Sequence, residues 1–582
     1  MKKQAHPLLP ALLIALSHCT TPPPAGDASP PDAAQDAMLN DLADGSPPDA
    51  EADGGADAAV DATPAWLGTY VPGTRAPAGQ GFLWGSATAG YQIEGQLENT
   101  DWRQWERMGR IVGNGQASDG PRSYPNFMPD VEALRASGQT AYRFGVEWAR
   151  LFPTAVSWEQ CRMATGTLSA RVTACRAAAN SQGKAYYHGL IDALRASTPR
   201  ITPMVTIHHW VMPDYIADPR QDFRTQGWMN PRIRTDMALL AAVIAGEFGD
   251  SVDWYVTLNE PLVLVLSGYL DGRFPPGRSL DFDAAIVVLN NMIYAHAMMY
   301  DNIKAMDTTV AEMTGGPISP AASSYVSIAH HMRRFFGANP TGANDARAAA
   351  KADWLNNRLF FEAIVNGNLD ADGSGVVDPT EPRNDAALRN RVDYLGVNYY
   401  GMSTIRANSA IPLLGGLPED EARDRGLPKN DFGWDVYPRG FEETLTTVAT
   451  LYNRPIVITE NGMADSRDVN RRRFMLEHIG AMLAAKQRGA NIVGYFHWSL
   501  MDNFEWVGGY CPHFGLFSVD FSDPMRTRVP RPSVMLYQQI IRSGTITDAQ
   551  LAAAAPYVSP PTFCNALPTM GGDAGTMADA GR

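Results

Sequence analysis

Short apolar runs typical of buried β-strands recur along most of this chain, and longer helical patterns separate them. The eight predicted strands are Phe82–Ala87, Ala141–Trp148, Pro203–His209, Val252–Glu260, Val310–Met313, Val392–Tyr400, Pro455–Glu460 and Ile492–Ser499. The predicted helices between them include Pro129–Ser137, Tyr186–Ala196, Thr235–Phe248, Asp283–Met306 and Arg471–Arg488. This alternation predicts an α/β fold, a single (β/α)8 TIM barrel with long loops at the carboxyl ends of its strands. An open doubly wound sheet is the alternative, but no glycine-rich phosphate loop follows any of these runs.

The first 19 residues have the pattern of an export signal. Lys2 and Lys3 precede an apolar run from Leu8 to Leu16, and Leu16-Ser17-His18-Cys19 resembles the cleavage box of bacterial lipoproteins. Lipidation of Cys19 would anchor the protein to a bacterial membrane. The alternative is a periplasmic or secreted protein without the lipid.

Most of the negative charge of this chain lies in one segment. The net charge is −14, and residues 20–64 hold ten acidic residues and no basic one. That segment consists largely of Pro, Ala, Gly and Asp, which predicts a disordered linker, and residues 566–582 predict a disordered tail. The folded domain should therefore span residues 65–565. No basic cluster indicates nucleic-acid binding.

Export makes disulfide bonds permissible. Four cysteines remain when Cys19 is set aside. Cys161 and Cys175 flank one polar insertion and are natural partners, which leaves Cys511 and Cys564 to tie the C-terminal tail to the body. The sequence alone allows three pairings, and it also allows free thiols.

Two glutamates each close an apolar strand-like run. Glu260 stands in Asn259-Glu260-Pro261, and Glu460 stands before Asn461-Gly462. Catalytic groups of (β/α)8 barrels collect at the carboxyl ends of the strands. Two carboxyl groups that face one cleft can serve as proton donor and nucleophile. The alternative is that each acid merely ends a strand and forms a surface salt bridge.

Polar and aromatic side chains gather at the other predicted strand ends. They are Gln92, Arg143, His209, Trp210, Asn398, Tyr400, Trp498, Glu505 and Trp506. Each one alone has a structural explanation in packing or ion pairing. Together they offer hydrogen-bonding groups and flat apolar faces, which is the mixture that a sugar ring needs.

These segments resemble glycoside hydrolase family 1, whose members are retaining β-glycosidases on a (β/α)8 barrel. The matching segments follow one another along the whole body and are Phe82–Gly95, Tyr142–Pro153, His208–Trp210, Thr257–Pro261, Gly268–Gly277, Leu395–Tyr400, Ile458–Asp465 and Gly494–Asp520. The resemblance implies hydrolysis of terminal β-linked sugars, foremost glucosides, through a covalent glycosyl-enzyme. The expected substrate is a small carbohydrate or an aryl glycoside, and catalysis needs no cofactor.

The resemblance also implies individual roles. It assigns Glu260 as the acid/base and Glu460 as the nucleophile, with Arg143 and Tyr400 holding Glu460 charged and Asn259 binding the sugar 2-hydroxyl. The implied sugar-binding residues are Gln92, His209, Trp210, Asn398, Trp498, Glu505 and Trp506. An acid at position 505 would also disfavour 6-phospho-glycosides.

Other activities fit the same residues. A β-galactosidase or β-fucosidase would use the same residue types, and a transglycosylase would differ only in loop shape and water access. A catalytically dead carbohydrate-binding barrel would be expected to lose one of the two glutamates or Asn259, and all three are present.

A segment outside this pattern fits the twelve-position EF-hand loop. Its predicted calcium ligands are Asp370, Asp372, Ser374, the carbonyl of Val376, Asp378 and Glu381. A helix is predicted before it, over Trp354–Asn366. Calcium here would be structural and would brace a loop without a part in bond cleavage. The alternative is a solvated acidic turn before the sixth strand.

Overall fold

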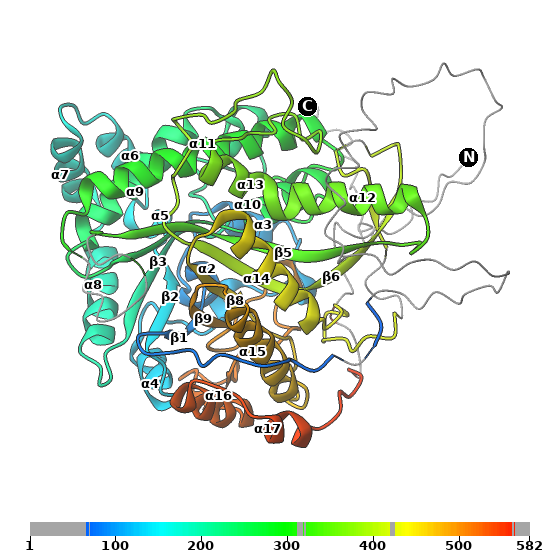
Figure 1. Ribbon diagram of the computed structural model, residues 1–582. Coiled ribbons are helices and arrows are strands. Elements are labelled where there is room, and N and C mark those ends of the chain that lie inside the picture. The colour runs from blue at the N-terminus through cyan, green and yellow to red at the C-terminus, as the bar shows by residue number, and fades with distance from the viewer. Residues whose placement is uncertain are drawn as a thin grey trace, which may run out of the picture. The chain divides into compact units, whose positions relative to one another are not determined.

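The computed structural model describes residues 66–68, 70–310, 318, 322–411, 413–419, 425–560 and 564 (Figure 1). The predicted export signal over residues 1–19, with Cys19, lies outside the described residues. The predicted linker over residues 20–64 and the predicted tail over residues 566–582 lie outside them as well.

Eight parallel strands of the described chain close into a barrel, which confirms the predicted fold class. They are β1 (Leu83–Ala87), β2 (Ala141–Gly145), β3 (Thr202–His208), β4 (Trp254–Asn259), β5 (Tyr325–Gly337), β6 (Leu395–Ala407), β8 (Ile456–Asn461) and β9 (Ile492–Trp498). Each strand pairs with its neighbour in chain order, and β1 pairs with β9 to close the ring. The short β7 (Gly416–Pro418) extends β6 antiparallel, while β10 (Phe517–Val519) and β11 (Arg528–Pro530) form a separate pair.

The strand sequences suit burial on both faces. Ile456-Val457-Ile458-Thr459 in β8 is buried at every position, and so is all of β9. Strands of a parallel sheet lie between the barrel interior and the helical layer, so they read as continuous apolar runs. Seven of the eight predicted strands coincide with observed strands to within a few residues, except that β6 continues seven residues beyond its predicted end at Tyr400.

The prediction of the fifth strand is wrong. Val310 is exposed and lies outside any strand, and residues 311–313 of that prediction lie outside the described residues. The fifth strand of the barrel is β5, which pairs in parallel with β4 and β6. Its sequence Tyr-Val-Ser-Ile-Ala-His-His lacks a continuous apolar run, because buried polar groups such as His330, packed against Phe361, interrupt it.

Helices cover the outside of the barrel (Figure 1). They are α2 (Gly90–Glu94), α3 (Asp101–Arg107), α4 (Met128–Ala136), α5 (Trp148–Leu151), α6 (Ala155–Arg162), α7 (Leu168–Ala178), α8 (Ser181–Arg195), α9 (Ile233–Phe248), α10 (Pro261–Val265), α11 (Phe282–Met306), α12 (Ala343–Asp353), α13 (Leu359–Phe361), α14 (Pro438–Tyr452), α15 (Arg471–Gln487), α16 (Pro532–Ser543) and α17 (Asp548–Ala553). Three π-helical turns are η5 (Leu266–Leu270), η6 (Trp354–Arg358) and η7 (Glu362–Asn366). Short 3₁₀ turns are η1 (Val112–Asn114), η2 (Ala117–Asp119), η3 (Phe223–Thr225), η4 (Gly227–Met229) and η8 (Trp506–Gly508).

The helix α11 is long and apolar enough to cross a membrane by length and composition alone. It packs against α9, however, and 61% of its most apolar window is buried within the protein. Its length and composition are therefore those of a core helix of the barrel.

The two predicted disulfides are both present. Cys161–Cys175 joins α6 to α7, and Cys511–Cys564 joins a loop after β9 to the end of the described chain. Of the three pairings that the sequence allows, the structure selects the one between neighbours in the chain.

Candidate active site

Glu260 and Glu460 lie at the carboxyl ends of β4 and β8, inside the barrel mouth. Both are buried, with 6% and 3% of each residue exposed. Pro261 begins α10 directly after Glu260. Asn461 is the last residue of β8. Each strand therefore ends within one residue of its acid, as the apolar run followed by Pro261 or by Asn461-Gly462 predicts.

A shared set of hydrogen bonds joins the surroundings of the two glutamates. Asn398, on β6, donates from Nδ2 to Glu260 Oε1 at 2.9 Å. Its Oδ1 accepts a hydrogen bond from the hydroxyl of Thr459 at 2.6 Å, and Thr459 precedes Glu460 in β8. The side chains of β4, β6 and β8 thus meet at one place, and the structure brings the two predicted carboxyl groups together.

Arg143 on β2 holds the carboxylate of Glu460. The guanidinium donates from Nη1 to Glu460 Oε1 and from Nη2 to Asn259 Oδ1, each at 2.7 Å. Tyr400 donates its hydroxyl to the other carboxylate oxygen of Glu460 at 2.7 Å. Both oxygens of Glu460 therefore accept a hydrogen bond, which favours the ionised carboxylate.

The two carboxyl groups differ in the neighbouring groups that raise or lower their pKa. Burial raises the pKa of both, and the negative charge of Glu460 raises the pKa of Glu260 further, well above its ordinary range. Arg143 and Tyr400 oppose the rise in the pKa of Glu460. A proton shared by the pair is therefore favoured on Glu260 over Glu460. This leaves one proton donor and one carboxylate, which is the division that a retaining mechanism requires.

The predicted sugar-binding residues make further contacts at the same strand ends. Gln92 donates to Glu505 Oε2 at 3.4 Å and to the Phe504 carbonyl at 2.7 Å. His209 Nε2 lies 2.8 Å from Asn259 Nδ2, and Trp210 donates to the Asn259 carbonyl at 2.9 Å. All of the predicted residues lie near these strand ends, and their contacts link them in one network.

Two buried polar atoms of these side chains have no partner among the described residues. They are Gln92 Oε1 and His209 Nδ1. The ring of His209 lies close to Trp498 and Trp506, at centroid distances of 5.8 Å in both cases. Because unpaired buried polar atoms cost free energy, these atoms suit a ligand that supplies hydroxyl groups beside an aromatic surface.

Three residues of the pocket have left-handed backbone conformations that ordinary side chains rarely adopt. They are Trp210 with φ 72°, Glu260 with φ 43° and Trp506 with φ 51°. Such strained residues persist where the surrounding structure fixes them, and they cluster at functional sites.

Several residues of the site were not predicted from the sequence. Thr206 accepts from Arg143 Nε at 2.9 Å, and Asn503 accepts from Gln92 Nε2 at 3.1 Å. Trp434 packs edge-on against Tyr400 at a centroid distance of 5.8 Å. Asn503 and Trp434 lie in loops and Thr206 is a small polar residue inside a strand, so no periodicity marks any of them. A signal for Asn503 was its place in the same short segment as Glu505.

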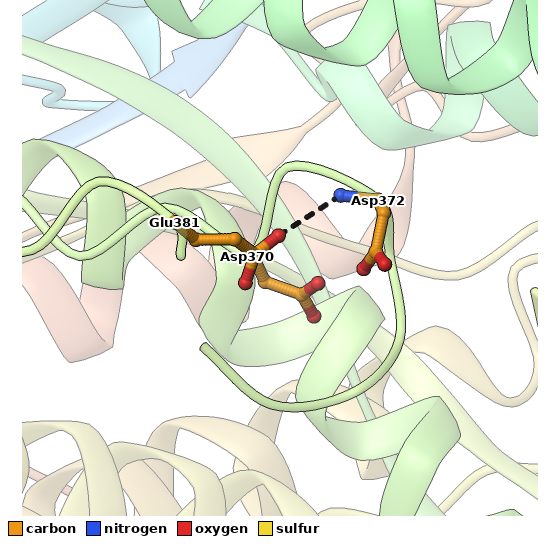
Figure 2. Close-up of side chains that lie close together, drawn as sticks. All are labelled: Asp370, Asp372 and Glu381. Carbon is orange, nitrogen blue, oxygen red and sulfur yellow. Dashed lines mark hydrogen bonds between the residues drawn. The ribbon is translucent and has the colours of Figure 1, made fainter. Parts of the chain in front are cut away.

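The predicted calcium loop brings three of its ligands together. One oxygen each of Asp370, Asp372 and Glu381 lies within 4.8 Å of the others (Figure 2). Gly375 donates its N–H to Asp370 Oδ2 at 2.9 Å, which curls the loop around the group. Burial and the charge of Glu381 raise the pKa of Asp370 to about 6.

The remaining predicted ligands of this loop behave differently. Ser374 donates its hydroxyl to the Val376 carbonyl at 2.9 Å. Asp378 is directed to Thr380, whose N–H and hydroxyl both donate to its carboxylate at 2.6 Å. The group of converging carboxylates in this loop therefore consists of Asp370, Asp372 and Glu381, and Asp378 is not part of it.

The chain matches the sequence model of Glycosyl hydrolase family 1 over residues 75–166 and 169–545. A β-galactosidase from Pyrococcus woesei is 32% identical over 521 residues, which cover 80% of this chain and 97% of that protein. The β-glucosidase A from Thermotoga maritima is 31% identical over 499 residues, which cover 81% of this chain and 98% of that protein.

Solved structures of similar proteins have the same barrel. The β-glycosidase from the hyperthermophile Thermosphaera aggregans matches with a TM-score of 0.70 and 25% identity, covering 83% of this chain and all of that one. The β-glucosidase from Thermotoga maritima, solved in complex with deoxynojirimycin, matches with a TM-score of 0.66 and 27% identity, covering 81% of this chain and all of that one.

Proposed function

Because the chain belongs to glycosyl hydrolase family 1 and is a β-glycosidase, we propose that Glu260 and Glu460 hydrolyse terminal β-glucosides in two displacements. The observation that carries this proposal is the shared frame of Arg143 and Asn398 around the two carboxyl groups. That frame supports opposite protonation states at neighbouring acids.

In the first displacement Glu260 gives its proton to the glycosidic oxygen. Glu460 attacks the anomeric carbon as the bond to the aglycone breaks, so a glycosyl ester forms and the aglycone leaves as an alcohol. Asn259 binds the sugar 2-hydroxyl, where contacts tighten in the oxocarbenium-like transition state.

In the second displacement the ester is hydrolysed. Esterification removes the charge of Glu460, so the pKa of Glu260 falls. Glu260 then takes a proton from water as the water oxygen attacks the anomeric carbon, and the carboxylate of Glu460 is released. The sugar leaves with its β-configuration retained.

Glucosides are the proposed main substrates, and galactosides or fucosides are the alternative. Similar proteins carry both kinds of name, β-galactosidase and β-glucosidase. The charge of Glu505 also determines whether sugar 6-phosphates are repelled from the site. Burial raises its pKa to about 8, so its repulsion of a 6-phosphate is complete only above that pH.

A panel of aryl β-glycosides tests the proposal. We expect Glu460→Gly to lose hydrolysis by about three or more orders of magnitude, because the covalent catalyst is gone. The control is Glu132→Gln, which removes an exposed carboxyl group on α4. Unchanged turnover of Glu460→Gly would remove this residue from its role, and sugar transfer to an added alcohol in place of water would identify a transglycosylase.

We propose that the loop Asp370–Glu381 binds a structural calcium ion. Three converging carboxylates support this site, because Ca²⁺ prefers such oxygen ligands. A melting curve with and without a chelator tests it, with Asp370→Asn as the variant and Asp523→Asn, in a turn elsewhere, as the control. A melting temperature that the chelator leaves unchanged would contradict calcium binding.

We also propose that the protein is exported and lipid-anchored through Cys19. The support is the sequence pattern of residues 1–19. Expression in a bacterium followed by fractionation tests this: Cys19→Ser should move the enzyme from the membrane fraction to the soluble one. An unchanged distribution would exclude the lipid anchor.

A further inference from the structure

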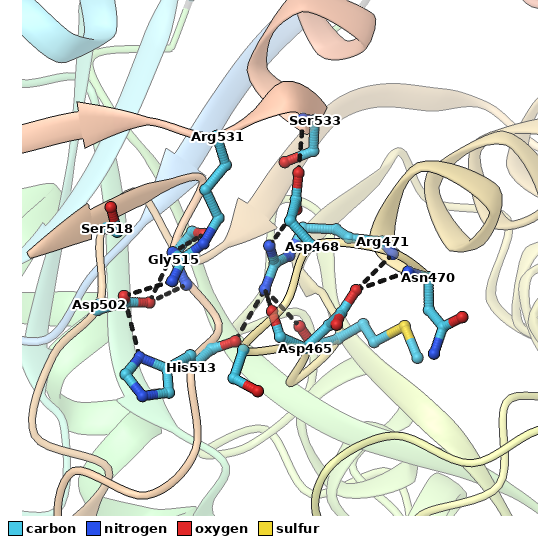
Figure 3. A network of polar contacts seen from close by, with 12 residues as sticks. Asp465, Asp468, Asn470, Arg471, Asp502, His513, Gly515, Ser518, Arg531 and Ser533 are labelled. Atoms are coloured by element: carbon cyan, nitrogen blue, oxygen red, sulfur yellow. Dashed lines mark hydrogen bonds and ion pairs between the residues drawn. The ribbon is translucent and has the colours of Figure 1, made fainter. Parts of the chain in front are cut away.

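The loop of residues 502–515 carries Glu505 and Trp506, and its base is fixed by polar contacts (Figure 3). The carboxylate of Asp502 accepts four hydrogen bonds at 2.8–3.0 Å, from the Gly515 N–H, from His513 Nδ1 and from Nη1 and Nη2 of Arg531. Arg471 reaches the same base, since its Nη2 donates to the His513 carbonyl at 2.8 Å. The two ends of the loop are therefore held together.

The tip of the loop is held by the second disulfide. Cys511 is exposed and is bonded to Cys564, 53 residues later in the chain. Short-range bonds connect Cys511 with Glu505: Cys511 donates its N–H to the Gly508 carbonyl at 3.3 Å, and Gly508 donates its N–H to the Glu505 carbonyl at 2.9 Å. Two backbone hydrogen bonds therefore connect the disulfide with Glu505.

The C-terminal segment before Cys564 lies against α15 and its N-cap residue Asn470. The hydroxyl of Tyr557 donates to Glu477 Oε2 at 2.7 Å, and Val558 donates its N–H to Asn470 Oδ1 at 2.8 Å. Cys564 itself donates its N–H to the Asp431 carbonyl at 2.7 Å. Cys564 is thus attached both to the loop 502–515 and to a second rim segment, residues 430–434.

Residues 430–434 connect to Glu460, the proposed nucleophile, through Tyr400. The rings of Phe432 and Trp434 stack at a centroid distance of 4.6 Å, and Trp434 packs against Tyr400. Tyr400 holds Glu460. The ring of Phe432 also lies against Gly508, because a Cβ on that glycine would be 3.5 Å from the ring.

We infer that the Cys511–Cys564 disulfide is a positioning element of the sugar-binding wall. It holds the loop 502–515 against the segment 430–434 and so places Glu505 and Trp506 toward the sugar. The inference rests on the proposed function of these two residues. Arg143 holds Glu460 and Asn398 holds Glu260 independently of the disulfide, which reaches Glu460 only through Trp434 and Tyr400. Losing the disulfide should therefore weaken sugar binding more than chemistry.

Reduction of the folded protein tests the inference. The exposed Cys511 makes its disulfide accessible to dithiothreitol, whereas Cys161 and Cys175 are fully buried. We expect two thiols to become alkylated and KM for an aryl β-glucoside to rise about tenfold, with kcat within about twofold. The inhibition constant of deoxynojirimycin should rise in parallel.

Variants provide the matched comparison. Cys511→Ser and Cys564→Ser should each reproduce the rise in KM, while the double variant Cys161→Ser/Cys175→Ser should lower the melting temperature and leave KM unchanged. If the variants do not fold, KM of the reduced native enzyme tests the positioning role.

An unchanged KM after reduction, with only a lower melting temperature, would overturn the positioning role, and so would a loss confined to kcat. Failure of the proposed function appears separately, as hydrolysis that survives Glu460→Gly.

Discussion

Arg143 and Glu460 form an ion pair that is closed to solvent, with Nη1 2.7 Å from Oε1 and side chains only 0% and 4% exposed. The same guanidinium also reaches Asn259. One planar cation thus contacts the proposed nucleophile and the proposed 2-hydroxyl contact together, and the ammonium group of a lysine lacks the rigid, planar arrangement of donors that holds both.

Arg143→Lys should therefore retain the charge but lose the paired geometry. We expect kcat to fall about 100- to 1000-fold, because a positioned electrostatic contact of the nucleophile is lost. Steady-state kinetics on an aryl β-glucoside measures the effect. Arg334→Lys, at an ion pair with Glu443 on the exposed side, is the control and should leave kcat within about twofold. Full activity of Arg143→Lys would contradict the need for a guanidinium that contacts Glu460 and Asn259 together.

Tyr400→Phe removes one hydrogen bond from the carboxylate of Glu460. That bond lowers the pKa of Glu460, so its loss should raise this pKa and move the acid limb of the pH–rate profile to higher pH. The maximal rate should fall about 10- to 100-fold. A profile of kcat/KM against pH measures both effects. Tyr215→Phe, whose hydroxyl donates to the Phe152 carbonyl, is the control. An acid limb that stays in place would show that Tyr400 does not tune the nucleophile.

The alkaline limb of the same profile should belong to Glu260, whose pKa is raised by burial and by the charge of Glu460. Activity should therefore fall when rising pH removes its proton. Glu260→Gln should lose that limb and retain fast glycosyl-enzyme formation only with aryl leaving groups that need no proton. Stopped-flow release of a dinitrophenol tests this. A persisting alkaline limb in Glu260→Gln would assign it to another group.

Glu505 is the group that could also produce such a limb. Its pKa rises from 4.5 to about 8, because of burial and the charge of Glu460. The folded state binds this proton more tightly than the unfolded state does, so the contribution of Glu505 to stability is highest below pH 4.5 and declines as pH rises to about 8. Glu505→Gln should remove this decline and gain on the order of 1 to 3 kcal/mol at pH 8. Its KM should rise, since the carboxyl group is lost from the sugar-binding wall. Urea unfolding at pH 5 and pH 8 measures the stability, and equal differences at the two pH values would contradict the shift.

Asp502 should have the opposite pH dependence. Burial opposes its ionisation, but His513 and Arg531 outweigh it and lower the pKa of Asp502 below 3.8. Its contribution to stability is therefore present above pH 3.8 and is lost as pH falls through the lower folded-state value. Asp502→Asn should cost about 1 to 3 kcal/mol at pH 7 and progressively less below pH 4. Urea unfolding at pH 7 and pH 3 measures this, and a cost that is the same at both would exclude the ionised carboxylate as its source.

The sequence identifies the barrel and the two acids because both leave local signals. A strand of a parallel barrel is a continuous apolar run, and Pro261 or Asn461-Gly462 marks where the run stops. The strand β5 could not be found in this way, because Ser327 and His330 interrupt its apolar pattern and are buried by tertiary packing.

The polar frame of the site was only partly predictable for a similar reason. Whether Asn398 joins Glu260, or Thr206 supports Arg143, depends on which strands become neighbours in the closed ring. In the predicted calcium loop, Thr380 donates two hydrogen bonds to the carboxylate of Asp378, which lies outside the group of three carboxylates. A sequence pattern shows the spacing of possible ligands, but it does not show which partner each carboxylate will have.

The left-handed backbone at Trp210, Glu260 and Trp506 has a consequence for protein engineering. Replacing Glu260 with glycine would relax the main chain and remove a buried carboxyl group, so heat resistance should rise while hydrolysis is lost. Selection of thermostable variants alone would therefore favour the loss of activity at position 260, and a screen of this enzyme must select for turnover at the same time.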